Sequence, residues 1–213
     1  MKARPGLTLR RIHPPVRLLP AVLLAALLIG SAGCRSAAPL PPETLGRDKR
    51  AQLTQGVAAV RASQQEAVAQ FERTVEAFAA GRGEDAFDES VDRTADVRRQ
   101  IETLEYLAQA LFAAWAEEIE LSNDQRLRAA GERSLAETRR LYEPLVETMR
   151  DAEREMDAAL DAFERRLRAR TEDAGAPAPD EAGLRDVVDE AVDRLEESAA
   201  EAGRFIRNLD AAD

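Results

Sequence analysis

Two helical stretches separated by three residues constrain the fold of this chain most strongly. Between residues 87 and 167, apolar side chains recur at steps dominated by three and four, and the pattern breaks only at 122–124, which reads Ser-Asn-Asp. This spacing places the apolar residues on one stripe of a helix. Because the break is short, the two helices must be antiparallel neighbours. We predict a coiled-coil hairpin with arms on the order of 54 and 68 Å long.

Each arm has a predicted core stripe. In the first arm it comprises Phe87, Val91, Val97, Ile101, Leu104, Ala108, Leu111 and Trp115. In the second arm it comprises Thr138, Tyr142, Leu145, Met149, Ala152, Met156, Ala159 and Phe163. The strict seven-residue repeat of the second arm predicts that the helices wind around each other. Pro144 interrupts the helical hydrogen bonding and predicts a kink at 140–144, either a tolerated bend or a functional hinge.

The predicted turn of the hairpin carries opposite charges on its two sides. Asn123 and Asp124 suit the N-cap of the second arm, because a short side-chain oxygen can accept from a free backbone N–H. The first arm ends with Glu117, Glu118 and Glu120, and the second begins with Arg126, Arg128 and Arg133. Both sets oppose the helix dipole. We expect ion pairs between them, the alternative being solvated clusters, and we expect Trp115 to lie opposite Gly131, where no side chain obstructs the indole.

Helical patterns also flank the hairpin. From about Asp48 to 81–83, the stripe comprises Leu53, Val57, Val60, Gln64, Ala67, Phe71 and Phe78. Gln64 could fix the register as a buried amide, but we predict that it faces solvent. In the last helix the stripe comprises Leu184, Val188, Ala191, Leu195, Ser198, Ala202, Phe205 and Leu209. The small residues of this last stripe predict loose docking or pairing with another chain.

These patterns predict an all-α fold, an elongated antiparallel coiled-coil bundle of three long helices plus a C-terminal helix. The bundle is predicted at 48–171, an Ala-, Gly- and Pro-rich linker at 172–180, and the C-terminal helix at 181–213. Residues 34–47 contain three prolines, which predict a stiff, extended tether in front of the bundle.

The pattern of residues 1–33 is that of a bacterial signal peptide. Five basic residues and no acid accompany an apolar run at 18–29, which is short for a membrane span. Ser31-Ala32-Gly33-Cys34 resembles the lipobox of bacterial lipoproteins, with serine where leucine is usual. We expect cleavage before Cys34 and attachment of lipid, including palmitate, to this only cysteine; an uncleaved signal anchor is the alternative. Arg35 favours the periplasmic face of the outer membrane, because the sorting rule of enteric bacteria associates aspartate there with inner-membrane retention.

The charge of the chain disfavours several classes of partner. The whole chain has 30 basic and 40 acidic side chains, a net charge of −10. Without the five basic residues of the predicted signal peptide, 25 basic and 40 acidic side chains remain, a net charge of −15. Such a surface is repelled by phosphate backbones and anionic headgroups. We expect no nucleic-acid partner and membrane contact only through the lipid on Cys34.

The residue types of most catalytic and metal sites are missing from the predicted mature chain. His13 is the only histidine and lies in the predicted signal peptide, which leaves no Ser-His-Asp, Cys-His, zinc or Glu-x-x-His site. Paired acids such as Glu117-Glu118 and Glu196-Glu197 could act on a cell-wall glycan. They lie on charged helix faces, where a raised pKa is not expected. We therefore predict no catalytic residue, cofactor or metal, and Cys34 as the only site.

Several motifs resemble one family. They read Lys49-Arg50, Leu111-Phe112-x-x-Trp115-x-x-Glu118, Leu127-Arg128 and Leu135-x-x-Thr138-Arg139-Arg140-x-Tyr142. They resemble the bacterial domain-of-unknown-function family numbered 2959, over about residues 48–168. The resemblance implies an exported or lipid-anchored helical protein with no established activity.

Together these features predict a non-enzymatic periplasmic lipoprotein that acts as a coiled-coil scaffold or adaptor. Its partner would be another protein or further copies of itself, bound through helical contacts. Two alternatives remain open, a cell-wall-active enzyme that uses paired carboxylates and an envelope sensor of stress or metal.

Overall fold

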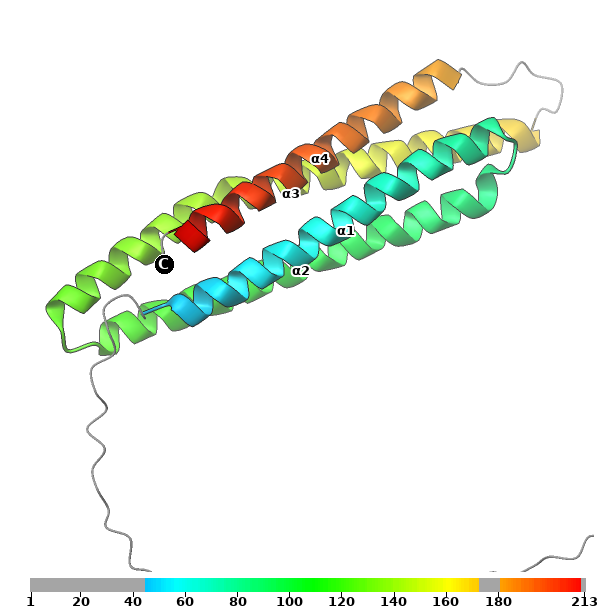
Figure 1. The fold of residues 1–213 in the computed structure, drawn as a ribbon. Coiled ribbons are helices and arrows are strands. Elements are labelled where there is room, and N and C mark those ends of the chain that lie inside the picture. The colour runs from blue at the N-terminus through cyan, green and yellow to red at the C-terminus, as the bar shows by residue number, and fades with distance from the viewer. Residues whose placement is uncertain (1–44, 173–180, 212–213) are drawn as a thin grey trace, which may run out of the picture. The chain divides into compact units, whose positions relative to one another are not determined.

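Four α-helices make up almost all of the chain that the computed structural model describes, residues 45–172 and 181–211 (Figure 1). They are α1 (Arg47–Ala79), α2 (Gly83–Leu121), α3 (Gln125–Glu172) and α4 (Glu181–Ala211). The predicted signal peptide, Cys34 and most of the predicted tether and linker lie outside these ranges. Within them, no helix is both long and apolar enough to cross a bilayer.

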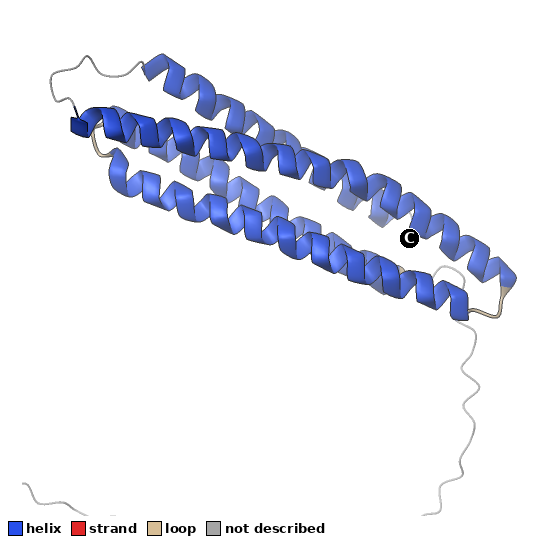
Figure 2. Cartoon of the chain, turned by 180° about the vertical axis from the view of Figure 1, so that it is seen from behind, coloured by secondary structure: helices blue, strands red, loops and turns tan. Residues whose placement is uncertain are grey.

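The four helices form an up-and-down bundle. Each helix runs antiparallel to the next one along the chain, as both views show (Figures 1 and 2). α1 and α3 each contact α2 and α4, so the helices surround one common core. The predicted all-α bundle of three long helices and a C-terminal helix is confirmed. The hairpin is confirmed too, with α2 and α3 joined at 122–124.

The core follows the predicted stripes over most of its length. From Leu145 onward, the predicted stripe of α3 is fully buried, and so is most of the stripe of α1. Phe163 stacks on both Phe78 and Phe71 of α1, with ring centroids 5.0 and 6.1 Å apart. The burial of these aromatic rings is a large contribution to the stability of the bundle.

The beginning of α2 departs from the prediction. Val91 is 40% exposed, whereas Ser90 and Thr94 are buried. The Oγ1 of Thr74 and the Oγ of Ser90 lie 2.8 Å apart, and Thr74 also donates to the backbone oxygen of Ala86 at 3.0 Å. Small hydroxyl side chains let α1 and α2 approach closely, and these hydrogen bonds offset their burial. The prediction of Val91 as a core residue was wrong because it ranked residues by apolarity alone.

Gln64 and α4 also depart from the prediction. Gln64 is fully buried rather than exposed, and its Nε2 donates to Ser198 Oγ at 2.8 Å. This polar contact fixes the register of α4 on α1. The stripe of α4 is buried throughout, and Phe205 meets the Tyr142 ring edge-on at 6.4 Å. The predicted loose docking, or pairing with another chain, was therefore wrong, because the small residues of α4 fit closely against α1 and α3.

Specific residues end α1 and cap the start of α3. Gly81 adopts φ 80°, and Arg82 N donates to Ala77 O at 2.8 Å, which closes α1. At the start of α3, Asp124 Oδ1 accepts from Arg126 N at 2.8 Å, so the predicted N-cap at Asp124 is confirmed. α3 continues as one helix through Pro144, and the kink there stays a prediction.

Candidate functional site

The most constrained packing surrounds the start of α1. We call it the N-terminal junction, formed by Leu45, Gly46, Lys49 and Arg50 together with the facing residues of α2 and α3. Gly46 adopts φ 79°, and a Cβ added to it would lie 2.0 Å from Cε2 of Trp115. Trp115 is 1% exposed. Only glycine fits this position, because a side chain would be strained in the left-handed region and would also overlap the indole.

The junction corrects the predicted partner of Trp115. A glycine does make room for the indole, but it is Gly46 rather than Gly131. A Cβ added to Gly131 would instead lie 2.8 Å from Ile119 Cγ1 and 3.8 Å from Leu45 Cδ1. Ile119, one turn beyond Trp115, fills the space between α2 and α3, so the indole lies toward the start of α1.

The charges near the turn are also arranged differently from the prediction. Lys49 of α1 forms an ion pair with Glu118, and Arg128 Nη2 donates to the backbone oxygen of Ser122 at 2.7 Å. In residues 45–172, no ion pair joins the acidic set that ends α2 to the basic set that begins α3. The predicted pairing between the arms was wrong, because α1 supplies the cation for Glu118.

A groove of about 640 Å³ lies beside the junction, between α3 and the last turns of α4. Arg50, which is 7% exposed, donates from Nη1 to Ser134 Oγ at 3.0 Å on its wall. On the same wall, Arg140 donates to Glu137 at 2.6 and 2.9 Å, and this hydrogen bonding lowers the pKa of the Glu137 carboxyl. Arg133 adds a third arginine. The groove is therefore locally basic on a chain with an acidic balance.

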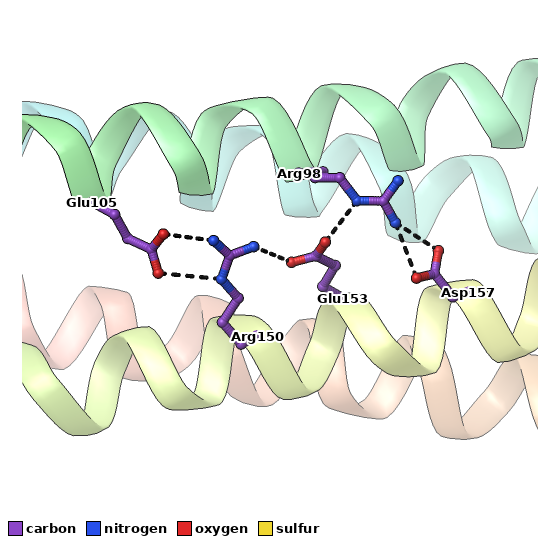
Figure 3. Close-up of polar contacts among 5 residues, drawn as sticks. All are labelled: Arg98, Glu105, Arg150, Glu153 and Asp157. Atoms are coloured by element: carbon purple, nitrogen blue, oxygen red, sulfur yellow. Dashed lines mark hydrogen bonds and ion pairs between the residues drawn. The ribbon is translucent and has the colours of Figure 1, made fainter.

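A row of alternating charges joins α2 to α3 (Figure 3). Arg150 binds Glu105 at 2.5 and 3.2 Å and Glu153 at 2.6 Å. Arg98 continues the row, with Nε 2.7 Å from Glu153 and Nη2 2.9 Å from Asp157. We call these five residues the ion row. Its charges alternate in sign along both helices and match in only one alignment of α2 with α3. The ion row therefore fixes the register of the hairpin.

The ion row shifts the pKa values of Glu153, Arg98 and Arg150. Burial opposes ionisation of Glu153, but hydrogen bonds from Arg98 and Arg150 outweigh it and lower the pKa. The hydrogen bond to Glu105 is the largest of the effects that raise the pKa of Arg150. Burial raises the pKa of the nearby Tyr142 hydroxyl, and the charge of Glu105 adds to that shift. These shifts favour the charged forms of Glu153 and Arg150 and the neutral form of the phenol.

The paired acids considered as possible catalysts are not buried against apolar side chains. Glu117 is exposed, Glu118 is held by Lys49, and both Glu196 and Glu197 are exposed. A general acid of a glycosidase needs a raised pKa, which burial against apolar groups provides. Over the described ranges, no three or more His, Cys, Asp or Glu side chains converge in a way that could hold a metal ion.

The comparison with protein families agrees with the residue motifs. A family model described as "Protein of unknown function (DUF2959)" matches residues 41–209. The chain belongs to this family. The match continues into α4, well past the 48–168 range over which the motifs suggested it. No curated protein and no solved structure matches the chain.

Proposed function

We propose that this chain is a non-enzymatic lipoprotein of the bacterial envelope that presents its bundle as a scaffold or adaptor. In this proposal, lipid on Cys34 anchors the chain, the Pro-rich residues after it act as a tether, and the bundle faces the periplasm. Arg35 favours the outer membrane as the site of the anchor. The partner is a protein or a further copy of the chain.

The N-terminal junction is the observation that supports this function best. Residues before Leu45 join the bundle at Gly46, whose backbone is packed on Trp115. The Lys49–Glu118 ion pair and the hydrogen bond from Arg50 to Ser134 hold the first turn of α1 against both arms of the hairpin. The start of α1 is therefore held on both α2 and α3, which gives a tethered scaffold a rigid point of attachment.

The anchor is tested by labelling cells with radioactive palmitate. The wild-type chain is expected to incorporate label and to sediment with the membrane, and its mature form should begin at Cys34. Cys34→Ser should remain unlabelled. Wild-type chain that stays unlabelled and keeps residues 1–33 would contradict the proposal and indicate an uncleaved signal anchor. Separation of the two membranes by density then tests the outer-membrane assignment.

The scaffold role is tested by cross-linking in the native membrane. A stoichiometric product with a protein, or with a second copy of the chain, is expected for the anchored form. Its loss in Cys34→Ser would show that anchoring brings the partners together. Failure to find either product at any cross-linker length would contradict the scaffold.

A further inference from the structure

One face of the bundle lacks charge in a chain of which 33% is charged. Residues 51–60 of α1 contain no Asp, Glu, Lys or Arg, and neither do residues 106–116 of α2. At the average frequency of charge, uncharged runs of this length are uncommon. Two of them in one short bundle call for a physical explanation.

The two uncharged segments lie side by side. A Cβ added to Gly56 would lie 2.9 Å from Leu104 Cδ1 and 3.1 Å from Leu107 Cδ2, so this part of α1 packs directly on α2. The Lys49–Glu118 ion pair lies just beyond one end of this contact. At the other end, the first charged residues are Arg61 of α1 and Glu105 of α2. The uncharged region is therefore a single surface bounded by charge at both ends.

The exposed side chains of this surface are small or neutral. Tyr106 is 78% exposed, the highest value among the large apolar and aromatic side chains of the described residues. On the two helices around it, exposed positions include Gln55, Ala59, Ala62, Ala110 and Ala113. We call this set the uncharged face. It combines one large exposed ring with small alanine side chains, over which another helix can approach closely.

We propose that the uncharged face is the contact by which two copies of this chain form a two-fold symmetric dimer. The chain has a net charge of −10, so two copies repel each other, and a contact through an uncharged surface avoids bringing further acidic side chains together. A two-fold contact also requires a self-complementary surface. The uncharged face meets this requirement, because the Tyr106 ring of one copy can lie on the alanines of the other.

The size of the face sets the strength of this dimer. About ten residues on each of two helices cover roughly 15 by 20 Å, or about 300 Å² per copy. A stable dimer buries about 800 Å² per copy, so the contact is expected to be weak and reversible in solution. Confinement of both copies to one membrane would raise their effective concentration. This inference names the partner of the proposed scaffold and rests on that function, although the contact itself requires only α1 and α2.

The first test measures association of the Cys34→Ser chain by sedimentation equilibrium, from about 10 μM to 1 mM, a range that brackets a weak contact. Reversible dimerisation is expected. Single cysteines placed at Ala110, and at Thr103, which is exposed on α2 about one turn before Tyr106, should then join two copies through a short bis-maleimide. Ala136→Cys, exposed on α3 among charged residues, is the matched control and should not cross-link. A monomer over the whole range with no cross-linking at Thr103 or Ala110 would overturn the inference.

The second test adds charge to the face. The double variant Ala59→Glu with Ala110→Glu is expected to weaken the dimer at least tenfold, while Ala136→Glu leaves it unchanged. Both positions of the double variant are exposed, so circular dichroism should show undiminished helix. A dimer that survives the double variant would overturn the assignment of this face. Palmitate labelling does not depend on dimer formation, so failure of the anchor and failure of the dimer are distinguishable.

Discussion

Helix α2 meets its two neighbours in different ways. Toward α1, the contact depends on shape, since Gly46 and Gly56 bring the backbone of α1 onto Trp115, Leu104 and Leu107. Toward α3, the ion row bridges the helices. The glycine contact brings the two helices close together without charged side chains over residues 51–60 and 106–116, whereas the ion row fixes register and covers the outer surface with charge. The α1–α2 side is consequently the one left available to a partner.

The largest expected effect follows from adding volume to the shape-based contact. Gly46→Ala should lower the free energy of unfolding by about 3 kcal/mol, from left-handed strain together with overlap of the indole. Gly81→Ala has the same backbone conformation at an exposed position and should lower it by only about 1 kcal/mol. Urea denaturation followed by circular dichroism measures both. Equal losses would mean that packing on Trp115 adds nothing.

Removal of a cation from the ion row should have a smaller effect. Arg150→Met leaves Glu105 and Glu153 without their shared partner and should lower the free energy of unfolding by about 1 kcal/mol. Arg154→Met is the control, because among the described residues Arg154 pairs only with Asp151, on the exposed side of α3, and its loss should change stability by less than about 0.5 kcal/mol. If the two variants were equally stable in urea, the row would not hold the hairpin together.

The ion row also predicts a dependence on pH. The pKa of Glu153 is lower in the folded chain than in the unfolded chain. The ionised carboxylate therefore makes its full contribution to the free energy of unfolding above the unfolded pKa, and this contribution is lost as the pH falls through the folded pKa. Between about pH 6 and pH 3, the wild-type chain should therefore lose more free energy of unfolding than Glu153→Gln. Identical pH profiles for the two chains would contradict the assignment.

The smallest effect on folding is expected at the uncharged face. Tyr106 is mostly exposed, so Tyr106→Ala should change the free energy of unfolding by less than about 0.5 kcal/mol at low protein concentration. The same substitution should weaken the dimer measured by sedimentation. A variant that unfolds markedly more easily as a monomer would show that the ring supports the bundle itself.

The periodicity of the sequence was sufficient to predict the bundle. The hairpin break at 122–124, the stripe of α3 and the N-cap at Asp124 follow from local rules, because each depends on residues close together in the chain. The prediction was wrong where a residue depends on distant ones. Gln64 is buried because Ser198, 134 positions away, accepts its hydrogen bond, and no local pattern contains that information.

The candidate site was less predictable than the fold. Trp115 suggested a glycine partner, but the sequence offered several glycines and the turn geometry alone selected the wrong one. Gly46 carries one usable signal, since it directly precedes the first helical residue and follows the Pro-rich stretch. The ion row depends on the exact register of two long helices. A shift of one residue would separate its charges, so no spacing rule within one helix could identify all five members.

Trp115 is the only tryptophan of the chain, and its buried indole nitrogen has no hydrogen-bond partner among residues 45–172 and 181–211. The tryptophan fluorescence of the protein is therefore emitted from a single position beneath Gly46. An indole in a dry, apolar environment emits at shorter wavelength than one in water. The emission wavelength therefore reports whether the first turn of α1 is packed on Trp115. This measurement is independent of the helical content of the bundle and requires no attached dye.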